Sequence, residues 1–402
     1  MTPDERAQIA EWRADTPGTE HRVHLNNAGA GLMPRSVSSV LRDHIELESV
    51  VGGYEAADMR RTQLAKVYEH IADLCATRPD NIAITSSATA AFVQAVSVHA
   101  FEPGDVIITS RLDYTSYQIQ YLALAERYGV VVLHAPDLPE GGVDPDGVRV
   151  LLAQNPRCKL VSITWIPTHT GTIQDVTAIG AICEAAGVTY HIDACQAIGQ
   201  LPIDVSALKC DYLSATGRKF LRGPRGTGFL YVSERALARG DRPLHIDMRG
   251  ATWTAPNEYL PATSAKRFEE WEFAYALVLG LGEAARYAIA ANVDACGQRA
   301  IALGAYTRAR LVELPGATVL DRGRNLSAVV TASFAGQDGR EIVRALTERR
   351  INTVASLRWF GLLDFGERGV ETAVRISPHY YNTEQEIDRL IDALHDVLDL
   401  AS

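Results

Sequence analysis

The stretch Asp211–Val232 reads DYLSATGRKFLRGPRGTGFLYV, and it holds two short apolar runs separated by a glycine-rich turn. The runs DYLSAT and FLYV have the β-branched and aromatic composition of buried strands. Lys219 lies in the turn, three residues after the first run ends. The stretch therefore predicts two neighbouring strands with a lysine close to the carboxyl end of the first.

Similar apolar runs alternate with amphipathic segments from about residue 60 to residue 235. The runs are NIAIT (81–85), DVIIT (105–109), GVVVLHA (129–135), KLVSITWI (159–166), VTYHIDA (188–194) and DYLSAT (211–216). Alternation of strands and helices is typical of a mostly parallel sheet covered on both faces. In such sheets, ligands bind at the carboxyl ends of the strands.

The pattern changes after about residue 285. A long helix is predicted over 288–314, followed by a strand near 326–334, a helix over 339–350, a strand over 372–378 and a closing helix over 383–400. This order is typical of an α+β module with a small antiparallel sheet. We therefore predict an α/β fold with two domains, a large domain of residues 22–284 and a smaller α+β domain of residues 1–21 and 285–402.

Composition limits the kinds of function that need to be considered. The 402 residues are 47% hydrophobic and 22% charged, with a formal net charge of -10, which argues against a general nucleic-acid binder. No secretory signal or membrane-spanning run is visible, so we expect a cytoplasmic protein without a membrane partner. The six cysteines show no CxxC pair and no histidine at metal-binding spacing, which favours reduced thiols and no metal site.

Asp193 and Lys219 are the pair that carries chemistry. Asp193 ends an apolar run, where an aspartate commonly begins a turn or caps a helix. Lys219 follows 26 residues later (219 − 193), so one strand–helix–strand unit places both side chains at one edge of the sheet. The chain has only five lysines, and arginine cannot replace lysine as an amine nucleophile.

Pyridoxal phosphate (PLP) suits this pair. It forms a Schiff base with a lysine, and a carboxylate keeps its pyridine nitrogen protonated so that the ring acts as an electron sink. The segment TSSATAAFVQA (85–95) supplies small residues at a strand-to-helix junction, which favours an anion such as phosphate. The alternatives are weaker, because GPRGTG lacks the GK[ST] ending of a P-loop and no GxGxxG follows an early strand.

Several motifs together resemble the class V, fold-type I PLP enzymes, a family that includes cysteine desulfurases, carbon–sulfur lyases and isopenicillin N epimerase-like proteins. The motifs stand in family order over nearly the whole chain: HLNNAGAGLMP, SSATAA, WIPTHTG, IDACQ, TGRKFLRGP and VRISPHYYNTEQEIDRL. The resemblance implies a PLP-dependent transferase fold, PLP as cofactor and a homodimer. It is much more specific for the fold than for the reaction.

The resemblance also implies residue roles. Lys219 resembles the Schiff-base lysine, Asp193 the partner of the pyridine nitrogen, and Gln196 and Thr168 the neighbours of the phenolic oxygen. Ala88, Thr89, Thr216 and Arg218 match the phosphate site, and Tyr114 matches the aromatic residue that stacks on the ring. Arg375 resembles the arginine that binds the substrate carboxylate, with Asn26, Ala28 and Gly29 on the substrate side. His169 is either an acid or base that faces the cofactor or a polar neighbour with a structural role.

The sequence departs from the family pattern at two places, and the first of them decides the predicted reaction. The segment INTVASLRWFGLLDF (351–365), where desulfurases carry a sulfur-accepting cysteine, contains none. Near residue 272, RFEEWEF stands where relatives offer a threonine to the neighbouring subunit. We therefore predict β-elimination by a carbon–sulfur lyase acting on a cysteine S-conjugate or a related sulfur amino acid, and consider a persulfide-forming desulfurase unfavoured. An aminotransferase, an epimerase and a decarboxylating deaminase are the alternatives.

Overall fold

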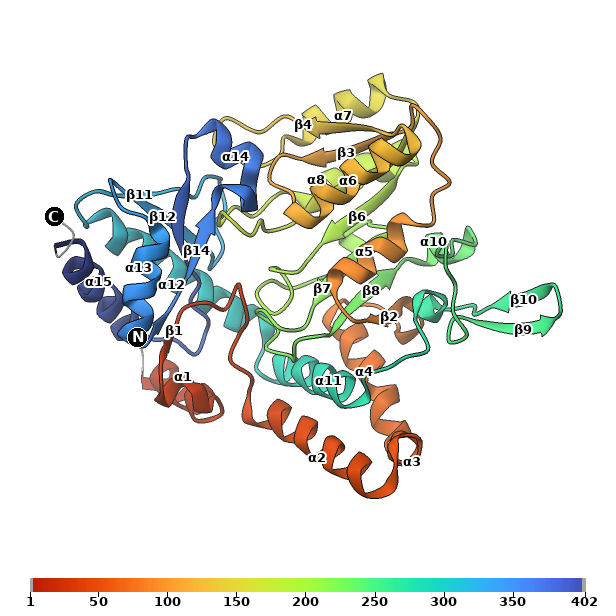
Figure 1. The fold of residues 1–402 in the computed structure, drawn as a ribbon, viewed down its shortest axis with the longest axis horizontal. Helices are drawn as coiled ribbons and strands as arrows, with labels where there is room; N and C mark the ends of the chain where they lie inside the picture. Colours follow the sequence, from red (N-terminus) through yellow and green to blue (C-terminus); the bar gives the residue numbers. More distant parts are fainter. Residues whose placement is uncertain (1–2, 400–402) are drawn as a thin grey trace.

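The computed structural model describes residues 3–399, and its largest element is a seven-stranded sheet (Figure 1). In spatial order the strands are β2 (Ile82–Thr85), β8 (Gly228–Val232), β7 (Tyr212–Thr216), β6 (Thr189–Asp193), β5 (Cys158–Thr164), β3 (Val106–Ser110) and β4 (Val131–Ala135). Only β8 runs against its neighbours. The prediction of a mostly parallel sheet is confirmed.

Helices cover both faces of this sheet, because alternate residues of the buried strands point to opposite sides. On one face, Phe92 and Tyr117 pack with Ile107; on the other, Ile179 packs with Ile108. The helices of this part of the chain are α2 (Arg35–Val51), α3 (Gly53–Met59), α4 (Arg61–Leu74), α5 (Ala88–Val96), α6 (Thr115–Tyr128), α7 (Pro145–Gln154), α8 (Val176–Ala186), α9 (Val205–Leu208), α10 (Glu234–Ala238) and α11 (Tyr275–Ala290). The sheet is thus buried between two helical layers.

The C-terminal part builds the predicted α+β unit around a second sheet. This sheet is antiparallel throughout, with the order β11 (Ala317–Val319), β12 (Val330–Phe334), β15 (Thr372–Ile376) and β14 (Val354–Leu357). Its helices are α12 (Val293–Val312), α13 (Gly339–Glu348), α14 (Leu362–Glu367) and α15 (Glu384–Asp399). Residues 1–2 and 400–402, which belong to the predicted second domain and to the end of its closing helix, lie outside the described residues.

The helix predicted over 288–314 is two helices, so this prediction is wrong. Helix α11 ends at Ala290 and α12 begins at Val293. Asn292 between them has a φ of 64°, in the left-handed region, and its side chain accepts a hydrogen bond from the N–H of Ala295. Asparagine tolerates this conformation and caps a new helix, so a continuous apolar pattern did not reveal the break.

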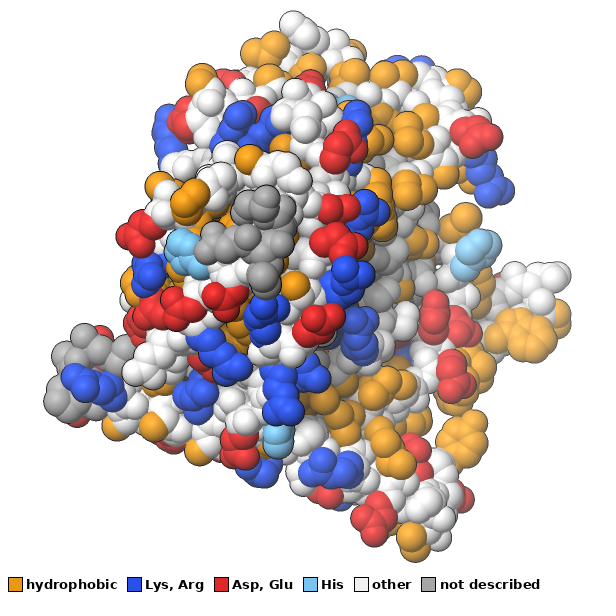
Figure 2. Space-filling view, turned by 60° about the vertical axis from the view of Figure 1, so that its left-hand side comes forward, with side chains coloured by type: hydrophobic (Ala, Val, Ile, Leu, Met, Phe, Trp, Pro, Cys, Tyr) orange, Lys and Arg blue, Asp and Glu red, His pale blue; other side chains and the backbone are white. Residues whose placement is uncertain are grey.

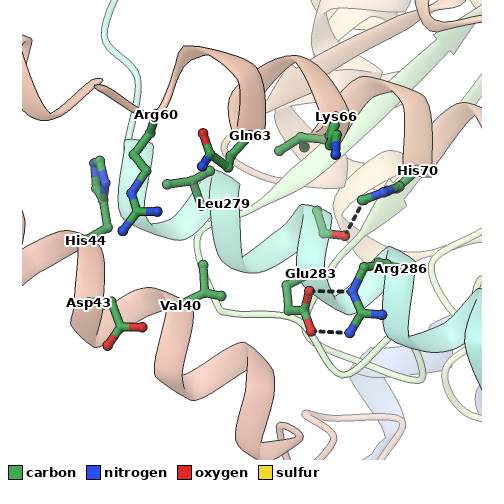
Figure 3. A pocket seen from close by; sticks show the side chains of 12 residues that line it. Val40, Asp43, His44, Arg60, Gln63, Lys66, His70, Leu279, Glu283 and Arg286 are labelled. Carbon is green, nitrogen blue, oxygen red and sulfur yellow. Dashed lines mark hydrogen bonds and ion pairs between the residues drawn. The ribbon is translucent and has the colours of Figure 1, made fainter. Parts of the chain in front are cut away.

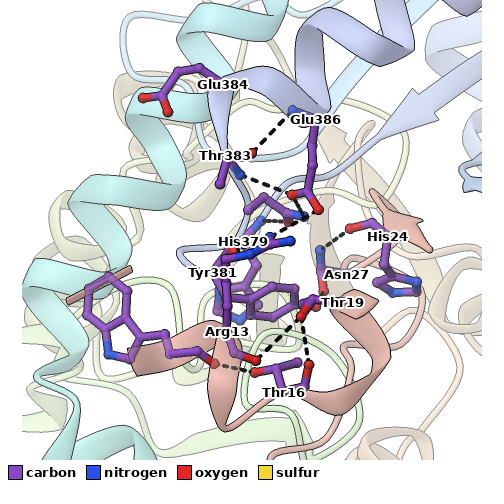
Figure 4. A network of polar contacts seen from close by, with 12 residues as sticks. Arg13, Thr16, Thr19, His24, Asn27, His379, Tyr381, Thr383, Glu384 and Glu386 are labelled. Atoms are coloured by element: carbon purple, nitrogen blue, oxygen red, sulfur yellow. Dashed lines mark hydrogen bonds and ion pairs between the residues drawn. The ribbon is translucent and has the colours of Figure 1, made fainter. Parts of the chain in front are cut away.

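The N-terminal segment is fastened to the C-terminal unit. Arg13, on α1 (Pro3–Ala14), donates a hydrogen bond to the carbonyl oxygen of Tyr381 at 3.0 Å and pairs with Glu386 at 3.0 Å (Figure 4). The hydroxyl of Tyr381 donates to the side-chain oxygen of Asn27. Strand β1 (Val23–His24) pairs with β13 (Ile351–Asn352). These contacts hold the loop after β1 in a defined position beside the large sheet.

A two-stranded hairpin, β9 (Ala251–Ala255) and β10 (Glu258–Pro261), projects from the right-hand side of the molecule (Figure 1). It was not among the predicted strands, because its side chains are largely exposed and leave no buried apolar run.

Candidate active site

The predicted acid and amine lie where two parallel strands end. Asp193 is the last residue of β6, and Thr216 is the last residue of the adjacent β7, with Lys219 three residues beyond it. Asp193 stands opposite Ser214 in the strand register. The chain therefore brings the two predicted groups to one edge of the sheet, as the spacing predicted.

Lys219 differs from the other lysines in its environment. Its side chain is only 7% exposed, whereas the four others, Lys66, Lys159, Lys209 and Lys266, are exposed. Lys66 lines a separate cavity of about 240 Å³ between α2, α4 and α11. In this cavity Glu283 pairs with Arg286 (Figure 3). Burial lowers the pKa of the Lys219 amine, so its neutral, nucleophilic form is more available.

Asp193 is also buried, and two opposing effects act on the pKa of its carboxyl group. Burial raises the pKa of its carboxyl group, while the positive charge of Lys219 lowers it. The backbone N–H of Cys195 donates to Asp193 Oδ1 at 2.8 Å and orients the carboxylate. A buried carboxylate of this kind is suited to hold the proton of a pyridinium ring.

The first turn of α5, directly after β2, has free backbone N–H groups of the kind that bind anions. Ser87 caps the helix, and its side chain accepts a hydrogen bond from the N–H of Ala90 at 3.1 Å. The N–H groups of Ala88 and Thr89 have no hydrogen-bond partner in residues 3–399, so they are free to bind a phosphate. Gly228 allows this turn to lie against β8, because a Cβ there would stand 2.7 Å from the backbone carbon of Ser87.

Tyr114 precedes α6 and presents its ring toward the lysine. The amine nitrogen of Lys219 lies 6.0 Å from the ring centroid. The N–H of Tyr114 donates to Asp113 at 3.1 Å, and Asp113 also accepts from Thr109 at 2.7 Å and from Tyr121 at 2.8 Å. We did not predict Asp113; its burial, which raises its pKa to about 6, becomes visible only once β3 and α6 are packed together.

Arg375, on β15, is a buried cation without a carboxylate. It donates to the carbonyl oxygen of Thr168 at 3.0 Å, to the Thr168 hydroxyl at 2.7 Å and to Asn26 at 3.3 Å. No acid lies within ion-pairing distance among the described residues, and its Nε atom has no partner there. Burial lowers its pKa to about 10, so it stays charged at neutral pH. An anionic ligand would satisfy this group.

The loop after β1, where we predicted substrate contacts, is bonded to Gln196 and Arg218. Gln196 donates to the carbonyl oxygen of Ala28 at 3.1 Å, and its own amide oxygen is buried without a partner in the described chain. Arg218 donates to the carbonyl oxygen of Gly29. Arg218, which we predicted at the phosphate, therefore contacts the loop after β1. Thr216 donates to the carbonyl oxygen of Thr227 at 3.3 Å.

His169 lies against the C-terminal unit. Its ring makes an edge contact with Phe365, and its Nε2 atom is 3.5 Å from a carboxylate oxygen of Asp364 on α14. A Cβ at Gly361 would stand 2.4 Å from the ring, so that glycine permits the contact. The side chain of His169 thus joins the Thr168 turn to α14. An acid or base role for it stays a prediction.

A second buried histidine supports the sheet edge and was missed. His191 lies on β6 two residues before Asp193 and contacts the hydroxyls of Ser162 and Ser214, each at 2.9 Å. Burial lowers its pKa to about 3, so it is neutral and acts as a hydrogen-bonding spacer between three strands. The sequence signal that could have identified His191 is a polar residue inside an apolar run.

The arrangement fits PLP as the fold-type I enzymes bind it: a buried lysine, a buried aspartate, free helix N–H groups, an aromatic ring, and unpaired polar atoms on Gln196 and Arg375. The model of the class-V aminotransferase family matches residues 23–390, and the chain belongs to that family. Its cofactor is PLP. This confirms the resemblance, the fold class and the cofactor predicted from the sequence.

Individual relatives point to sulfur chemistry. The chain is 26% identical over 393 residues to a probable cysteine desulfurase of Methanothermobacter thermautotrophicus, with 96% of this chain and 97% of that protein covered. Among solved structures, the apo cysteine desulfurase of Thermococcus onnurineus NA1 matches with a TM-score of 0.89 at 21% identity, covering 97% and 98% of the two chains. A variant of C-DES with glycine covalently linked to its PLP cofactor matches with a TM-score of 0.84 at 23% identity, covering 96% and 99%.

These relatives contradict the predicted reaction. We predicted β-elimination by a carbon–sulfur lyase and disfavoured a desulfurase, because residues 351–365 contain no cysteine. The relatives named as cysteine desulfurases point instead to a desulfurase. The physical reason for the error is that a loop cysteine is a sulfur acceptor. Its absence removes one acceptor and leaves the groups that act on the substrate carbon unchanged.

The same comparisons show a PLP-dependent enzyme. Within residues 3–399, no helix has the length and apolar character needed to cross a membrane.

Proposed function

We propose that this protein is a cysteine desulfurase that takes L-cysteine as substrate and releases L-alanine. The observation that carries the proposal is the buried, unpaired guanidinium of Arg375 in the same site as Lys219, because this pair suits the α-carboxylate and the Cα proton of an amino acid. The relatives named as cysteine desulfurases support the choice of cysteine as the amino acid.

The residues divide the work as follows. PLP, when bound, supplies an electron sink that stabilises negative charge at Cα. Arg375 holds the substrate carboxylate, and its contacts with Thr168 and Asn26 limit its motion. Lys219 has a lowered pKa, so its neutral amine accepts the Cα proton as a general base. Asp193 keeps the ring nitrogen protonated, and Tyr114 covers one face of the site.

The product identifies the reaction. Holoenzyme supplied with L-cysteine and a reducing thiol is expected to form alanine, which amino-acid analysis measures directly. L-Serine, which has no sulfur, is the matched control substrate and should give no alanine. Formation of pyruvate and ammonia in place of alanine would contradict the proposal, because those are the products of elimination.

We also propose that the protein acts as a homodimer in the cytoplasm. The hairpin exposes Trp253 (79%) and Leu260 (66%), and α3 exposes Tyr54 and Met59. Figure 2 shows hydrophobic side chains on the arm that projects at the right-hand side. Large exposed apolar side chains of this kind support a subunit interface. The cytoplasmic location is supported by the six cysteines, which are all unpaired.

The hairpin residues test the dimer. Replacing Trp253 and Leu260 together with serine is expected to raise the dimer dissociation constant at least about 100-fold, because each apolar side chain contributes roughly 1.5–3 kcal/mol when buried. Sedimentation velocity over a concentration series measures this constant. Val150→Ser, an exposed residue on α7 away from the hairpin, is the control. An unchanged constant in the double variant would show that the hairpin is not the interface.

A further inference from the structure

All six cysteines of the chain are buried and electrostatically unsuited to accept sulfur. None of their side chains is more than 9% exposed. Burial raises the pKa of Cys75 and Cys296 to about 12 and that of Cys158 to about 11, and it raises those of Cys183, Cys195 and Cys210 as well. The thiolate is the nucleophile in sulfur transfer. None of these thiols is therefore poised to attack.

The segment that would carry an acceptor cysteine is held against the large domain. After β14 it forms a short 3₁₀ helix (Arg358–Gly361) and then α14. The hydroxyl of Thr115, at the start of α6, donates to the carbonyl oxygens of Trp359 at 3.2 Å and Phe360 at 3.0 Å. Together with the contact between His169 and Asp364, these bonds hold the segment against the large domain. It offers no thiol, and its 3₁₀ helix is bonded to α6.

Cys195 is the cysteine closest to the reacting groups, and its surroundings disfavour it as an acceptor. It lies two residues after Asp193, and its backbone N–H is bonded to that carboxylate. The negative charge of Asp193 opposes ionisation of the thiol in addition to burial. A thiol kept protonated beside a carboxylate is a weak nucleophile. The chain thus has a site for the substrate carbon and none for its sulfur.

We infer that the sulfur leaves on a small external thiol, which enters the site as a second substrate. The inference rests on the proposed desulfurase function. In the step, the acceptor thiolate attacks the substrate sulfur, an S–S bond forms, and the Cβ–S bond breaks with its electron pair retained by Cβ. Cβ takes up one proton, which balances the proton lost by the acceptor. The net change is RSH plus cysteine giving RSSH plus alanine.

The closed geometry favours a small thiol over a cysteine on another protein. Lys219 and Arg375 are 7% and 9% exposed, and residues 358–367 contact Thr115 and His169 of the large domain. A surface cysteine of a folded partner would need the chain around these two buried groups to move before it reached the substrate. A thiol of a few heavy atoms needs no such movement.

A single-turnover experiment tests the inference. Holoenzyme in excess is mixed with L-cysteine, so that no free cysteine is left to act as acceptor, with or without 2-mercaptoethanol. Alanine formation is expected to be at least about tenfold slower without the added thiol, since attack requires a thiolate. With the thiol, alanine and the mercaptoethanol persulfide should appear in equal amounts. Mass spectrometry of alkylated peptides should find no added sulfur on any of the six cysteines.

The two ways of failing are distinguishable. One equivalent of alanine formed without the thiol, with an added sulfur on one cysteine peptide, would overturn the inference and leave the desulfurase function standing. The absence of alanine under every condition would instead contradict the proposed function. Lys219→Ala is the matched control, and it should produce neither alanine nor persulfide in either arm.

Discussion

Replacing Lys219 with alanine is expected to lower kcat/KM for L-cysteine by at least about 10³-fold, within the range that a positioned general base contributes. The variant also loses the amine that attaches the cofactor, so the visible absorption of the bound cofactor should change and PLP should be lost on dialysis. Because Lys219 is buried with a lowered pKa and forms no ion pair in the described residues, its removal should leave the thermal unfolding temperature nearly unchanged.

Lys66→Ala is the matched control, since Lys66 is an exposed lysine on α4 in the separate cavity of Figure 3. It should keep the absorption and the activity of the unmodified protein. Retention of cofactor attachment and activity in Lys219→Ala would refute the assignment of the reactive lysine and reopen the question for the four exposed lysines.

Replacing Arg375 with alanine is expected to lower kcat/KM for L-cysteine roughly 100-fold, or about 2.7 kcal/mol, because charge-assisted hydrogen bonds to the substrate carboxylate are lost. Its pKa of about 10 leaves the guanidinium charged over the neutral range, so the loss should be similar from pH 6 to pH 8. The effect should fall mainly on KM, which steady-state kinetics separates from kcat.

Stability distinguishes this role from a structural one. Removal of Arg375 leaves Thr168 and Asn26 without a donor but also removes a buried cation with no counter-ion. These effects oppose each other, so we expect the free energy of unfolding to change by less than about 2 kcal/mol. Arg340→Ala, at an exposed arginine paired with Asp338, is the control and should not alter KM. A large loss of stability in Arg375→Ala with unchanged KM would contradict substrate binding.

Much of the fold could be predicted because it depends on local patterns. The apolar runs that end at Asp193 and Thr216 became β6 and β7, since buried strands require continuous hydrophobic residues. The break at Asn292 could not be predicted, because a single residue with a positive φ interrupts a pattern that is helical on both sides. The predicted reaction was also wrong. Family motifs identify the cofactor site, but the composition of one loop does not identify the group that accepts the substrate sulfur.

The candidate site shows the same division. Spacing along the chain placed Asp193 and Lys219 at one sheet edge, because strand–helix–strand units have a regular geometry. Spacing along the chain could not predict the contacts of Arg218, Asp113 and His169. Each of these environments depends on segments that lie 50 to 200 residues apart or come from different layers. Examples are the bond from Arg218 to Gly29, the burial of Asp113 and the contact of His169 with Asp364.

The sequence by itself determined the strands of the large sheet, their order along the chain, and the lysine–aspartate pair that suits PLP. Only the tertiary structure decided that Arg375 is a buried cation with no carboxylate partner among the described residues, that the 3₁₀ helix before α14 is bonded to the large domain, and that all six thiols are buried. The physical reason is that burial and charge balance depend on every segment packed around a group, while strand formation and residue order depend on the neighbouring residues alone.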